Sequence, residues 1–487
     1  MEKLCFELED VEVTFLDQLI LSIPRLAIHQ FDRIGIVGKN GTGKSTLIRL
    51  LHGQITPSKG SVHIIAEAAY FGQLTAPEPE KADPKQIRSL GLEDKNRSKL
   101  SGGEQTRLKL AQLFSEYHEA LLVDEPTTHL DTEGKQYFLD ELEYYYGALV
   151  LVSHDRHVLD QLATKIWEVA DGSVTEYTGN YSDYVAQKEM EKIQQQEQFD
   201  KYQKEKQRLL KAAEEKKKKA DKITQASGSM TKKDTKSLAN KMFMTKSRGT
   251  SQKAVHRAAK AIEQRIEQME EVAAPTSEKQ LYFHQSEALK LHNKFPIMAD
   301  DLSLRVGKRE LLSKVRFQFP LGETIAITGD NGTGKTTLLQ AIVEGKEGII
   351  LSPKVEIGFY RQMSYQFEKE ETVLAYMKSR SDYQESKIRA VLNAMSFTGN
   401  DIKKNVQDLS GGEAIRLVLC QLFLGRYNIL ILDEPTNFLD VFSIEALEKF
   451  IEGYEGTILL VSHDKAFVDR VADRVYKIEK QQLTLLD

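Results

Sequence analysis

Short apolar runs recur in two stretches of the chain, one near each end. Each run has four to eight residues and is bounded by glycine, polar or charged residues, a pattern typical of buried strands. The predicted strands are Phe31–Gly38, Ala120–Val123, Gly147–Val152, Gly322–Gly329, Asn428–Leu432 and Gly456–Val461. Helical patterns lie between them, the first with Leu47, Leu50 and Leu51 on one face. Strands that alternate with helices predict two α/β domains, each with a mostly parallel sheet.

The stretch between these two regions has a different pattern. Residues 184–222 lack glycine and proline and are rich in Glu, Gln, Lys and Ala, which predicts one long, exposed helix. The polar segment that begins at Ile223 interrupts this pattern. Apolar residues then recur at alternating spacings of four and three, as in an a/d seam, at Val255, Ala259, Ile262, Ile266 and Met269. The sequence therefore predicts an antiparallel helical hairpin whose turn, the tip, lies within about 223–250.

These patterns predict three domains. An α/β domain spans residues 1–183, the helical hairpin linker spans 184–285, and a second α/β domain spans 286–487. The two α/β domains carry four motifs in the same order: GKNGTGKS, LSGGEQ, LLVDEPT and LVSHD in the first, and GDNGTGKT, LSGGEA, LILDEPT and LVSHD in the second. The last three motifs keep the same spacing in both copies, whereas the interval after the first motif is longer in the second copy. One fold used twice explains this register.

The first motif of each copy is a glycine-rich turn between a predicted strand and a predicted helix. Its glycines let backbone amides turn toward phosphate oxygens, its lysine neutralises the terminal phosphates, and its Ser or Thr offers a hydroxyl to Mg²⁺. A chance glycine-rich turn would explain one copy, but not two in the same context. We therefore predict nucleotide binding by Gly38, Asn40, Gly41, Gly43, Lys44, Ser45 and Thr46, and by Gly329, Asn331, Gly332, Gly334, Lys335, Thr336 and Thr337.

The third motif places two carboxylates at the end of an apolar strand, beside the predicted phosphates. We expect Asp124 and Asp433 to hold Mg²⁺ through water, and Glu125 and Glu434 to polarise the attacking water. The alternative is that Asp-Glu only caps a strand before proline, but the spacing recurs in both copies. The predicted Mg²⁺ ligands are Ser45, Gln73, Asp124, Thr336, Gln362 and Asp433. Gln73 and Gln362 each follow an aromatic pair, and spacing alone leaves open whether they are ligands of Mg²⁺ or water at all.

The fourth and second motifs complete the predicted site. His154 and His463 follow short apolar strands, where a lone histidine is usually capped or solvated, but the recurrence favours contact with the γ-phosphate. The Ser-Gly-Gly-Glu motif is a helix N-cap with Glu at N3, which alone explains one copy. A helix start with adjacent glycines also binds phosphate. We therefore expect Ser101, Gly103, Ser410 and Gly412 at the nucleotide.

Together these motifs resemble the ATP-binding-cassette superfamily over nearly all of both halves. The resemblance implies two P-loop ATPase domains stacked head-to-tail, with Lys44 facing Ser410 and Lys335 facing Ser101. Two ATP molecules with Mg²⁺ would be held between the domains, and hydrolysis would release the clamp. The aromatic residue that stacks on adenine in this superfamily corresponds to Phe15 here. The matching position in the second half, near Val306, is not aromatic, so we expect unequal sites.

The position of the insert selects a branch of the superfamily. No apolar run is long enough to span a bilayer, which argues against direct transport. The P-loop-to-signature intervals leave no room for the coils of chromosome-maintenance relatives, and two cysteines cannot supply the zinc modules of excision-repair relatives. An insert between the cassettes, flanked by GNYSDYVAQK and FPIMADDLSL, resembles the ABC-F group of ribosome-binding ATPases. The short first cassette most resembles the antibiotic-resistance members, of the macrolide–streptogramin or Msr type.

The charge of the linker fits this resemblance. Residues 201–260 hold 19 Lys and Arg against 5 Asp and Glu, although the whole chain has a net charge of −5. Such an excess favours a polyanionic partner such as rRNA over the alternative, a merely solvated coil. Apolar residues in an otherwise polar tip predict a contact there, or else packing of the hairpin's own end. The predicted rRNA and drug-pocket residues are Leu238, Lys241, Met242, Phe243 and Met244.

The resemblance implies a cytoplasmic ATPase, a monomer whose two cassettes form an intramolecular dimer. It would bind the 70S ribosome at the tRNA exit site, contact 23S rRNA and the P-site tRNA, dislodge an antibiotic, and leave after ATP hydrolysis. The absence of an apolar leader pattern and the two isolated cysteines agree with a reducing cytosol. Two alternatives remain at this stage: a housekeeping translation factor that rescues stalled ribosomes, and the ATPase subunit of a drug exporter.

Overall fold

The structure is a computed structural model. It describes residues 2–16, 18–72, 82–90, 100, 102–127, 130, 132–228, 254, 257–258, 260–262, 264–269, 272, 280–284, 287–307, 309–361, 367 and 369–486. The chain divides into two compact units. The cassette unit comprises Met1–Tyr184 and Lys279–Asp487, and the linker unit comprises Val185–Glu278.

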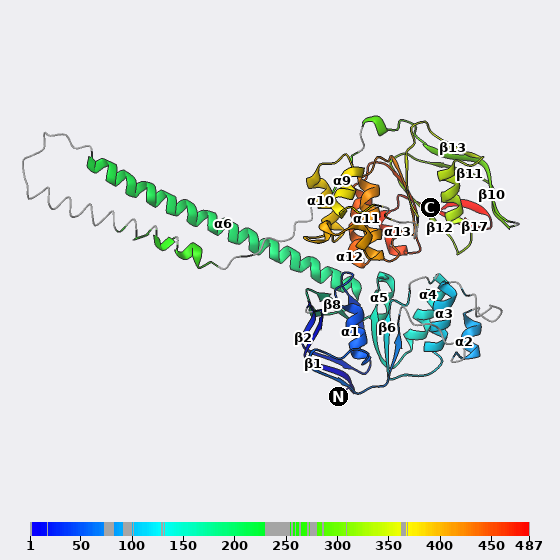
Figure 1. Ribbon diagram of the computed structural model, residues 1–487, viewed down its shortest axis with the longest axis horizontal. Helices are drawn as coiled ribbons and strands as arrows, with labels where there is room; N and C mark the ends of the chain where they lie inside the picture. Colours follow the sequence, from blue (N-terminus) through cyan, green and yellow to red (C-terminus); the bar gives the residue numbers. More distant parts are fainter. Residues whose placement is uncertain are drawn as a thin grey trace, which may run out of the picture. The chain divides into compact units, whose positions relative to one another are not determined.

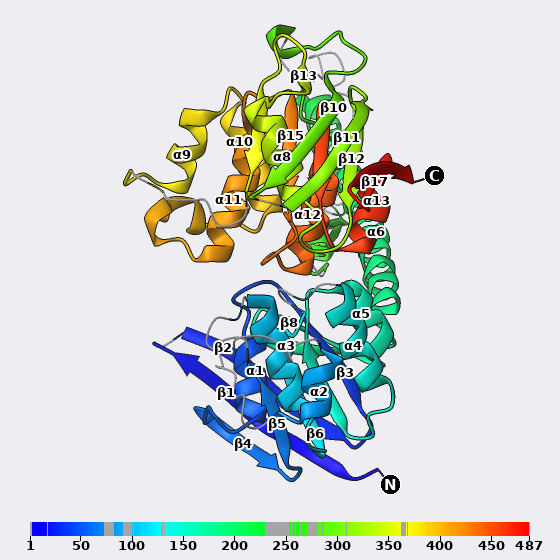
Figure 2. The ribbon, with the colours of Figure 1, turned by 90° about the vertical axis from the view of Figure 1, so that its right-hand side faces the viewer.

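A six-stranded sheet forms the centre of the first cassette (Figures 1 and 2). Its strand order is β5-β6-β7-β3-β8-β9, and all neighbours are parallel except β8 and β9. The strands are β3 (Arg33–Val37), β5 (Ala68–Phe71), β6 (Ala120–Asp124), β7 (Ala148–Val152), β8 (Lys165–Ala170) and β9 (Ser173–Thr178). Every residue of β6 and β7 is buried, because helices or a second sheet cover both faces.

The second cassette repeats this sheet with the order β14-β15-β16-β12-β17-β18, again parallel except for the last pair. Its strands are β12 (Thr324–Thr328), β14 (Ile357–Tyr360), β15 (Ile429–Asp433), β16 (Thr457–Val461), β17 (Arg474–Glu479) and β18 (Gln482–Leu486). All six strands predicted from the apolar runs are present. The predicted fold class, two α/β cassettes in tandem with mostly parallel sheets, is confirmed.

Each cassette also has a three-stranded antiparallel sheet that the apolar runs did not predict. The orders are β2-β1-β4 and β11-β10-β13. The strands are β1 (Leu4–Phe15), β2 (Gln18–His29), β4 (Lys59–Ile64), β10 (Ile297–Val306), β11 (Arg309–Phe319) and β13 (Ile349–Leu351). Buried and exposed residues are interspersed along these strands, since only one face of the sheet packs on the core. The long hairpins β1–β2 and β10–β11 end at Phe15 and Val306, next to the P-loops.

Helices that begin at the motifs surround each central sheet. They are α1 (Lys44–Leu51), α3 (Gly102–Leu113), α4 (Thr132–Glu143) and α5 (Arg156–Leu162), matched by α8 (Lys335–Glu344), α11 (Gly411–Leu424), α12 (Val441–Glu452) and α13 (Lys465–Val471). A short α2 (Pro84–Ser89) precedes α3, whereas α9 (Val373–Arg380), α10 (Glu385–Ala394) and two 3₁₀ turns (Asp401–Lys403 and Val406–Asp408) precede α11. The longer interval of the second copy forms these extra elements.

The P-loop helix of each cassette is clamped between its two sheets. Leu47, Leu50 and Leu51 of α1 are buried as predicted, in one cluster with Phe6 of β1 and Leu122 of β6. The matching cluster of the second cassette holds the buried apolar residues of α8 between β10 and β15. This packing fixes the P-loop, which leads directly into the helix, relative to the strand that carries the carboxylates.

The linker unit is built on α6 (Tyr181–Gly228), a single helix of 48 residues (Figure 1). The predicted limits, 184 and 222, are wrong at both ends. The helix starts earlier because Asn180 and Asp183 exchange hydrogen bonds, Asp183 N–H to Asn180 Oδ1 at 3.0 Å and Asn180 N–H to Asp183 Oδ2 at 3.1 Å, as in a capping box. It passes through Ile223 because the following residues tolerate helical geometry, and it ends at Gly228.

A second helical stretch returns along the linker. Residues 254, 257–258, 260–262 and 264–267 are helical, and the seam residues Ile262, Ile266 and Met269 are half-buried. The guanidinium of Arg265 lies 3.9 Å from the Glu205 carboxylate of α6. Leu209 and Ala213, also on α6, are buried. The seam positions 255 and 259, and all five predicted tip residues, lie outside the described residues. Among the helices described, none is long and apolar enough to cross a membrane.

Candidate active site

Both P-loops have the backbone conformation that phosphate binding requires. Gly43 and Gly334 both have φ of 106°, in the left-handed region that an L side chain rarely adopts. A Cβ on Gly41 would meet nothing within 4 Å, so the loop is open on that side. The buried Lys44 amine donates to Gly38 O at 2.7 Å and to Lys39 O at 2.9 Å, and Lys335 makes the matching bonds in the second cassette. Burial lowers the pKa of both lysines.

A hydroxyl and a carboxylate meet at the end of the central strand in each cassette. Thr336 donates from Oγ1 to Asp433 Oδ1 at 3.2 Å, and Ser45 hydrogen-bonds Asp124 in the first cassette. Burial raises the pKa of both aspartates, although these hydrogen bonds oppose the shift. Oxygen ligands of this kind suit Mg²⁺, which would also keep several waters. The other two predicted ligands, at positions 73 and 362, lie outside the described residues.

Glu125 and Glu434 have strained backbones. Their φ angles are 52° and 51°, which is uncommon for a residue other than glycine and is tolerated where the surroundings enforce it. The surroundings here are the neighbouring strands, since Glu125 N–H donates to Val152 O and Glu434 N–H to Val461 O, each at 2.9 Å. Burial raises the pKa of Glu125 to about 8 and that of Glu434 to about 7.

Each glutamate contacts the histidine of the fourth motif. The Nε2 atom of His154 lies 3.2 Å from Glu125 Oε1, and its backbone N–H donates to Glu125 Oε2 at 3.4 Å. His463 and Glu434 repeat the arrangement, at 3.4 and 3.2 Å. Burial, assisted by Lys44, lowers the pKa of His154 to about 3, so its imidazole is neutral. The contact is therefore between a neutral imidazole and a carboxyl group, not an ion pair.

Several buried polar atoms in this region make no hydrogen bond within the described residues. They include Glu125 Oε1, His154 Nδ1 and Glu434 Oε1. Buried polar groups are almost always hydrogen-bonded, so these atoms call for a ligand or water. They face a cavity of about 1480 Å³ that is lined by both P-loops. The open cradle at Gly41, the lysines and the hydroxyl–carboxylate pairs together fit a nucleoside triphosphate with Mg²⁺.

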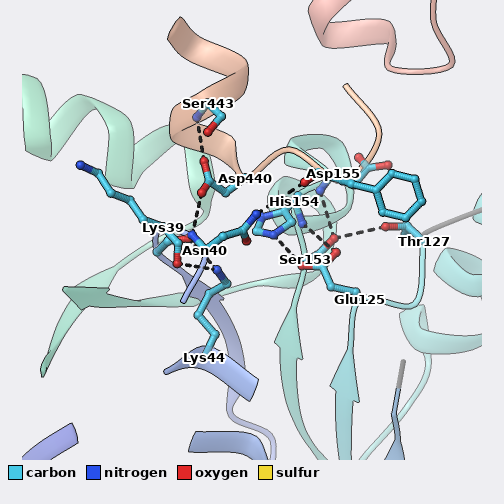
Figure 3. A network of polar contacts seen from close by, with 12 residues as sticks. Lys39, Asn40, Lys44, Glu125, Thr127, Ser153, His154, Asp155, Asp440 and Ser443 are labelled. Atoms are coloured by element: carbon cyan, nitrogen blue, oxygen red, sulfur yellow. Dashed lines mark hydrogen bonds and ion pairs between the residues drawn. The ribbon is translucent and has the colours of Figure 1, made fainter. Parts of the chain in front are cut away.

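The signature of the second cassette lies against the P-loop of the first. Ser410 caps α11 and forms a capping box with Glu413. A Cβ on Gly412, in the first turn of α11, would lie 3.6 Å from Asn40 Nδ2. The backbone N–H of Asn40 donates to Asp440 Oδ2 at 2.6 Å (Figure 3). Lys44 and Ser410, which are expected to face each other, line the same cavity.

Most of the predicted site residues surround this one cavity. Those that line it are Phe15, Asn40, Gly41, Gly43, Lys44, Ser45, Thr46, Gly103, Asp124, Glu125, His154, Asn331, Gly332, Gly334, Lys335, Thr336, Thr337, Ser410, Gly412, Glu434 and His463. Three further predicted residues hydrogen-bond the residues that line the cavity. The carbonyl groups of Gly38 and Gly329 accept from the P-loop lysines, and the Asp433 carboxylate accepts from Thr336. Gly103 lies on the lining with Lys335, whereas position 101 lies outside the described residues.

Comparisons with known proteins identify the family. A sequence profile described as ABC transporter matches residues 21–93 and 312–437, and an extension profile of the same description matches 167–241. The chain is 40% identical over 488 residues to the "Erythromycin resistance ATP-binding protein MsrA" of Staphylococcus epidermidis, covering 99% of each chain. It is 31% identical to the "Ribosome protection protein VmlR" of Bacillus subtilis (strain 168), covering 96% of this chain and 85% of that one. The chain belongs to the ABC-F subfamily and is of the Msr type.

Solved structures agree with this ABC-F assignment at the level of the fold. An "RNase-L Inhibitor" superposes with a TM-score of 0.66 at 19% identity, covering 98% of this chain and 91% of that chain. An archaeal ribosome recycling factor, solved in complex with a ribosomal stalk protein, gives 0.65 at 19% identity, covering 97% and 89%. The two cassettes of this ABC-F protein therefore share their fold with these structures.

Sequence reasoning missed the residue that joins the P-loop to the partner cassette. Asp440 is fully buried, caps α12 by accepting Ser443 N–H at 2.8 Å, and accepts Asn40 N–H. Although burial raises its pKa, these hydrogen bonds lower it more, so Asp440 stays charged. Arg416, itself buried, lies 3.6 Å away. A Leu-Asp pair recurs at the same distance after DEPT in both copies, and this recurrence in the sequence could have identified Asp440 as a candidate site residue.

A second missed contact joins α12 to the first cassette. Arg156, the first residue of α5, donates to Glu448 Oε1 at 2.7 Å, and Glu448 is 1% exposed. The second carboxylate oxygen lies 3.2 Å from Arg470 of its own cassette. One turn earlier, Glu445 accepts a hydrogen bond from the Tyr181 hydroxyl at 3.3 Å. Helix α12 thus reaches the first cassette at three places.

The residues of each half-site would divide the work of ATP hydrolysis. The P-loop amides and lysine would hold the phosphates, and the Ser45 or Thr336 hydroxyl with its aspartate would hold Mg²⁺, which supplies charge neutralisation when bound. The glutamate carboxyl, fixed by its strained backbone, would orient and accept a proton from water. The histidine lies against that carboxyl and would fix its direction. The opposite signature would supply the positive end of a helix.

Replacing Glu125 and Glu434 together by glutamine tests this division. The change keeps the size of both side chains but removes the proton acceptors, so we expect ATP turnover to fall by about 10²–10³-fold. ATP affinity should persist, because the P-loops are untouched. Phosphate release measures turnover and calorimetry measures affinity. A double variant that hydrolyses ATP at close to the parent rate contradicts the assignment.

Replacing Glu448 by glutamine tests the contact between the cassettes. Arg156 would then be buried without its counter-charge, and such losses cost about 2–5 kcal/mol, so we expect turnover to fall at least about tenfold. Each P-loop should still bind ATP. The matched control is Arg470→Met, since Arg470 touches the same carboxylate from within the second cassette and is exposed. Equal losses in both variants would mean that the contact between cassettes is not the cause.

Proposed function

We propose that this protein binds the bacterial ribosome in an ATP-dependent manner and protects it from antibiotics. The observation that carries the proposal is the 40% identity over 99% of the chain to a protein named for erythromycin resistance. A second relative is named as a ribosome protection protein. The match to both spans the linker as well as the cassettes, so the likeness is not confined to the shared ATPase motifs.

The linker favours ribosomal RNA as the binding partner. Its described residues form a long helix with many exposed lysines, and residues 201–260 hold 19 Lys and Arg against 5 Asp and Glu. Lysine and arginine bind RNA phosphates by displacing counterions. The ABC-F resemblance directs this hairpin to the exit site, where it would meet 23S rRNA and the P-site tRNA of the 70S ribosome.

The cassettes supply the switch in this proposal. With ATP bound, the P-loop of each cassette and the signature of the other close on the nucleotide, and the protein stays on the ribosome. Hydrolysis removes the γ-phosphate that both cassettes hold, so the protein dissociates. The predicted tip residues, Leu238, Lys241, Met242, Phe243 and Met244, would act beside the drug pocket, directly or by displacing rRNA bases.

Co-sedimentation tests ribosome binding. We expect the Glu125→Gln, Glu434→Gln double variant to pellet with 70S ribosomes in ATP and to remain in the supernatant in ADP, because only the triphosphate is held by both cassettes. Raised salt should weaken the binding steeply, as expected for phosphate contacts. If the variant instead follows membranes and ignores ribosomes, the exporter alternative replaces the proposal.

Exchange of the tip tests drug protection. Replacing 238–244 by Gly and Ser should leave ATP turnover intact and abolish protection of a susceptible host from a macrolide. Growth across antibiotic classes and phosphate release by the purified protein provide the two measurements. The matched control replaces the same number of exposed residues on the outer face of α6. Resistance that survives the tip exchange would overturn the role of the tip, and a host that gains no resistance from the parent chain would favour the housekeeping alternative.

A further inference from the structure

The two cassettes differ where their long hairpins approach the P-loops. In β1–β2 the last pair of the ladder is Phe15 with Gln18, and in β10–β11 it is Val306 with Arg309. The first hairpin therefore presents an aromatic ring and an amide, whereas the second presents a small aliphatic side chain and a guanidinium group. All of these except Gln18 line the nucleotide cavity.

Arg309 reaches over the second P-loop. Its terminal nitrogen lies 3.8 Å from the position that a Cβ on Gly332 would take. At the matching position of the first cassette, Gly41, nothing lies within 4 Å. The second site therefore has a planar cation where the first has open space beside its loop.

The Arg309 side chain is free to meet a ligand. It is exposed, and no hydrogen bond or ion pair engages its guanidinium within the described part of the chain. The nearby carboxylate of Glu310 forms an ion pair with Arg305 at 2.8 Å, not with Arg309. The group therefore lies beside the phosphate loop, on the lining of the cavity, and is available to a bound nucleotide.

We propose that Arg309 stacks on the adenine base of the second ATP site, in the role predicted for the Phe15 ring in the first. A guanidinium group is planar and delocalised and stacks on aromatic rings, nucleobases included. Val306 is too small to cover a purine, so Arg309 supplies the flat surface, and the buried Leu311 closes the apolar floor beside it. The proposal rests on ATP binding by the cassettes, not on ribosome protection.

The test measures ATP affinity at the second site by calorimetry, in the full chain with Lys44→Ala to remove binding at the first site. We expect Arg309→Ala to weaken binding about tenfold, which corresponds to about 1.4 kcal/mol. Arg309→Tyr should retain most of the affinity because it restores a stacking surface, whereas Arg309→Lys should not. Adding Val306→Phe to Arg309→Ala should recover binding, because it rebuilds the surface of the first site. Unchanged affinity in Arg309→Ala overturns the proposal.

Two controls separate stacking from other effects. Titration with inorganic tripolyphosphate, which lacks a base, should give equal affinities for the parent and Arg309→Ala. An equal loss for ATP and tripolyphosphate, together with rescue by Arg309→Lys, would show a phosphate contact and overturn the stacking role. Gln18→Ala, measured at the first site in a Lys335→Ala background, should change ATP affinity less than about twofold. Arg309→Ala should leave the first site unchanged in that same background, which excludes misfolding.

Discussion

The bond between the Asn40 amide and the Asp440 carboxylate is the constraint on which the first site depends. A fully buried carboxylate is costly unless several donors satisfy it. Asp440 obtains one donor from its own helix, at Ser443, and another from the P-loop of the opposite cassette. Because Asp440 caps α12, the same bond aligns α12 with the first P-loop. Helix α11 is held beside Asp440 by Arg416, which lies 3.6 Å from the carboxylate. The position of the signature over the first P-loop follows from this shared charge.

A repeated sequence has produced two sites with the same electrostatic pattern at the catalytic glutamates. Burial raises the pKa of Glu125 to about 8 and that of Glu434 to about 7. In each cassette the P-loop lysine lowers this pKa and the neighbouring aspartate raises it, while Lys135 of the first cassette adds a smaller lowering effect at Glu434. The ends of the hairpins, Phe15 and Val306, add a difference at the base. The two copies thus share the residues of the phosphate site and differ in its surroundings.

The sequence predicted those features that are determined by residues close together in the chain. Buried parallel strands such as β6 and β15 are continuous apolar runs, and the P-loop carries its glycines within one turn, so both were readable. The antiparallel sheets were missed because charged residues such as Glu7 and Glu9 on the exposed face of β1 broke the apolar runs that marked the other strands. The limits of α6 were wrong because a cap at Asn180 and tolerant residues after Ile223 outweighed composition. Arg156–Glu448 and Asn40–Asp440 join residues of different cassettes, and only the folded chain brings them together.

The same cross-cassette surface includes the start of the linker helix. Tyr181 is the first residue of α6 and donates to Glu445 of α12, while Tyr184 donates to Glu168 of β8 at 3.0 Å. Both tyrosines are buried in the core of the first cassette. The first turn of α6 is therefore rigid with respect to the first cassette but shares one hydrogen bond with the second. Any separation of the cassettes must break that bond together with Arg156–Glu448 and Asn40–Asp440. In the proposed ATP-dependent cycle, closure of the cassettes would therefore act directly on the helix that carries the linker, the segment that distinguishes the ABC-F group.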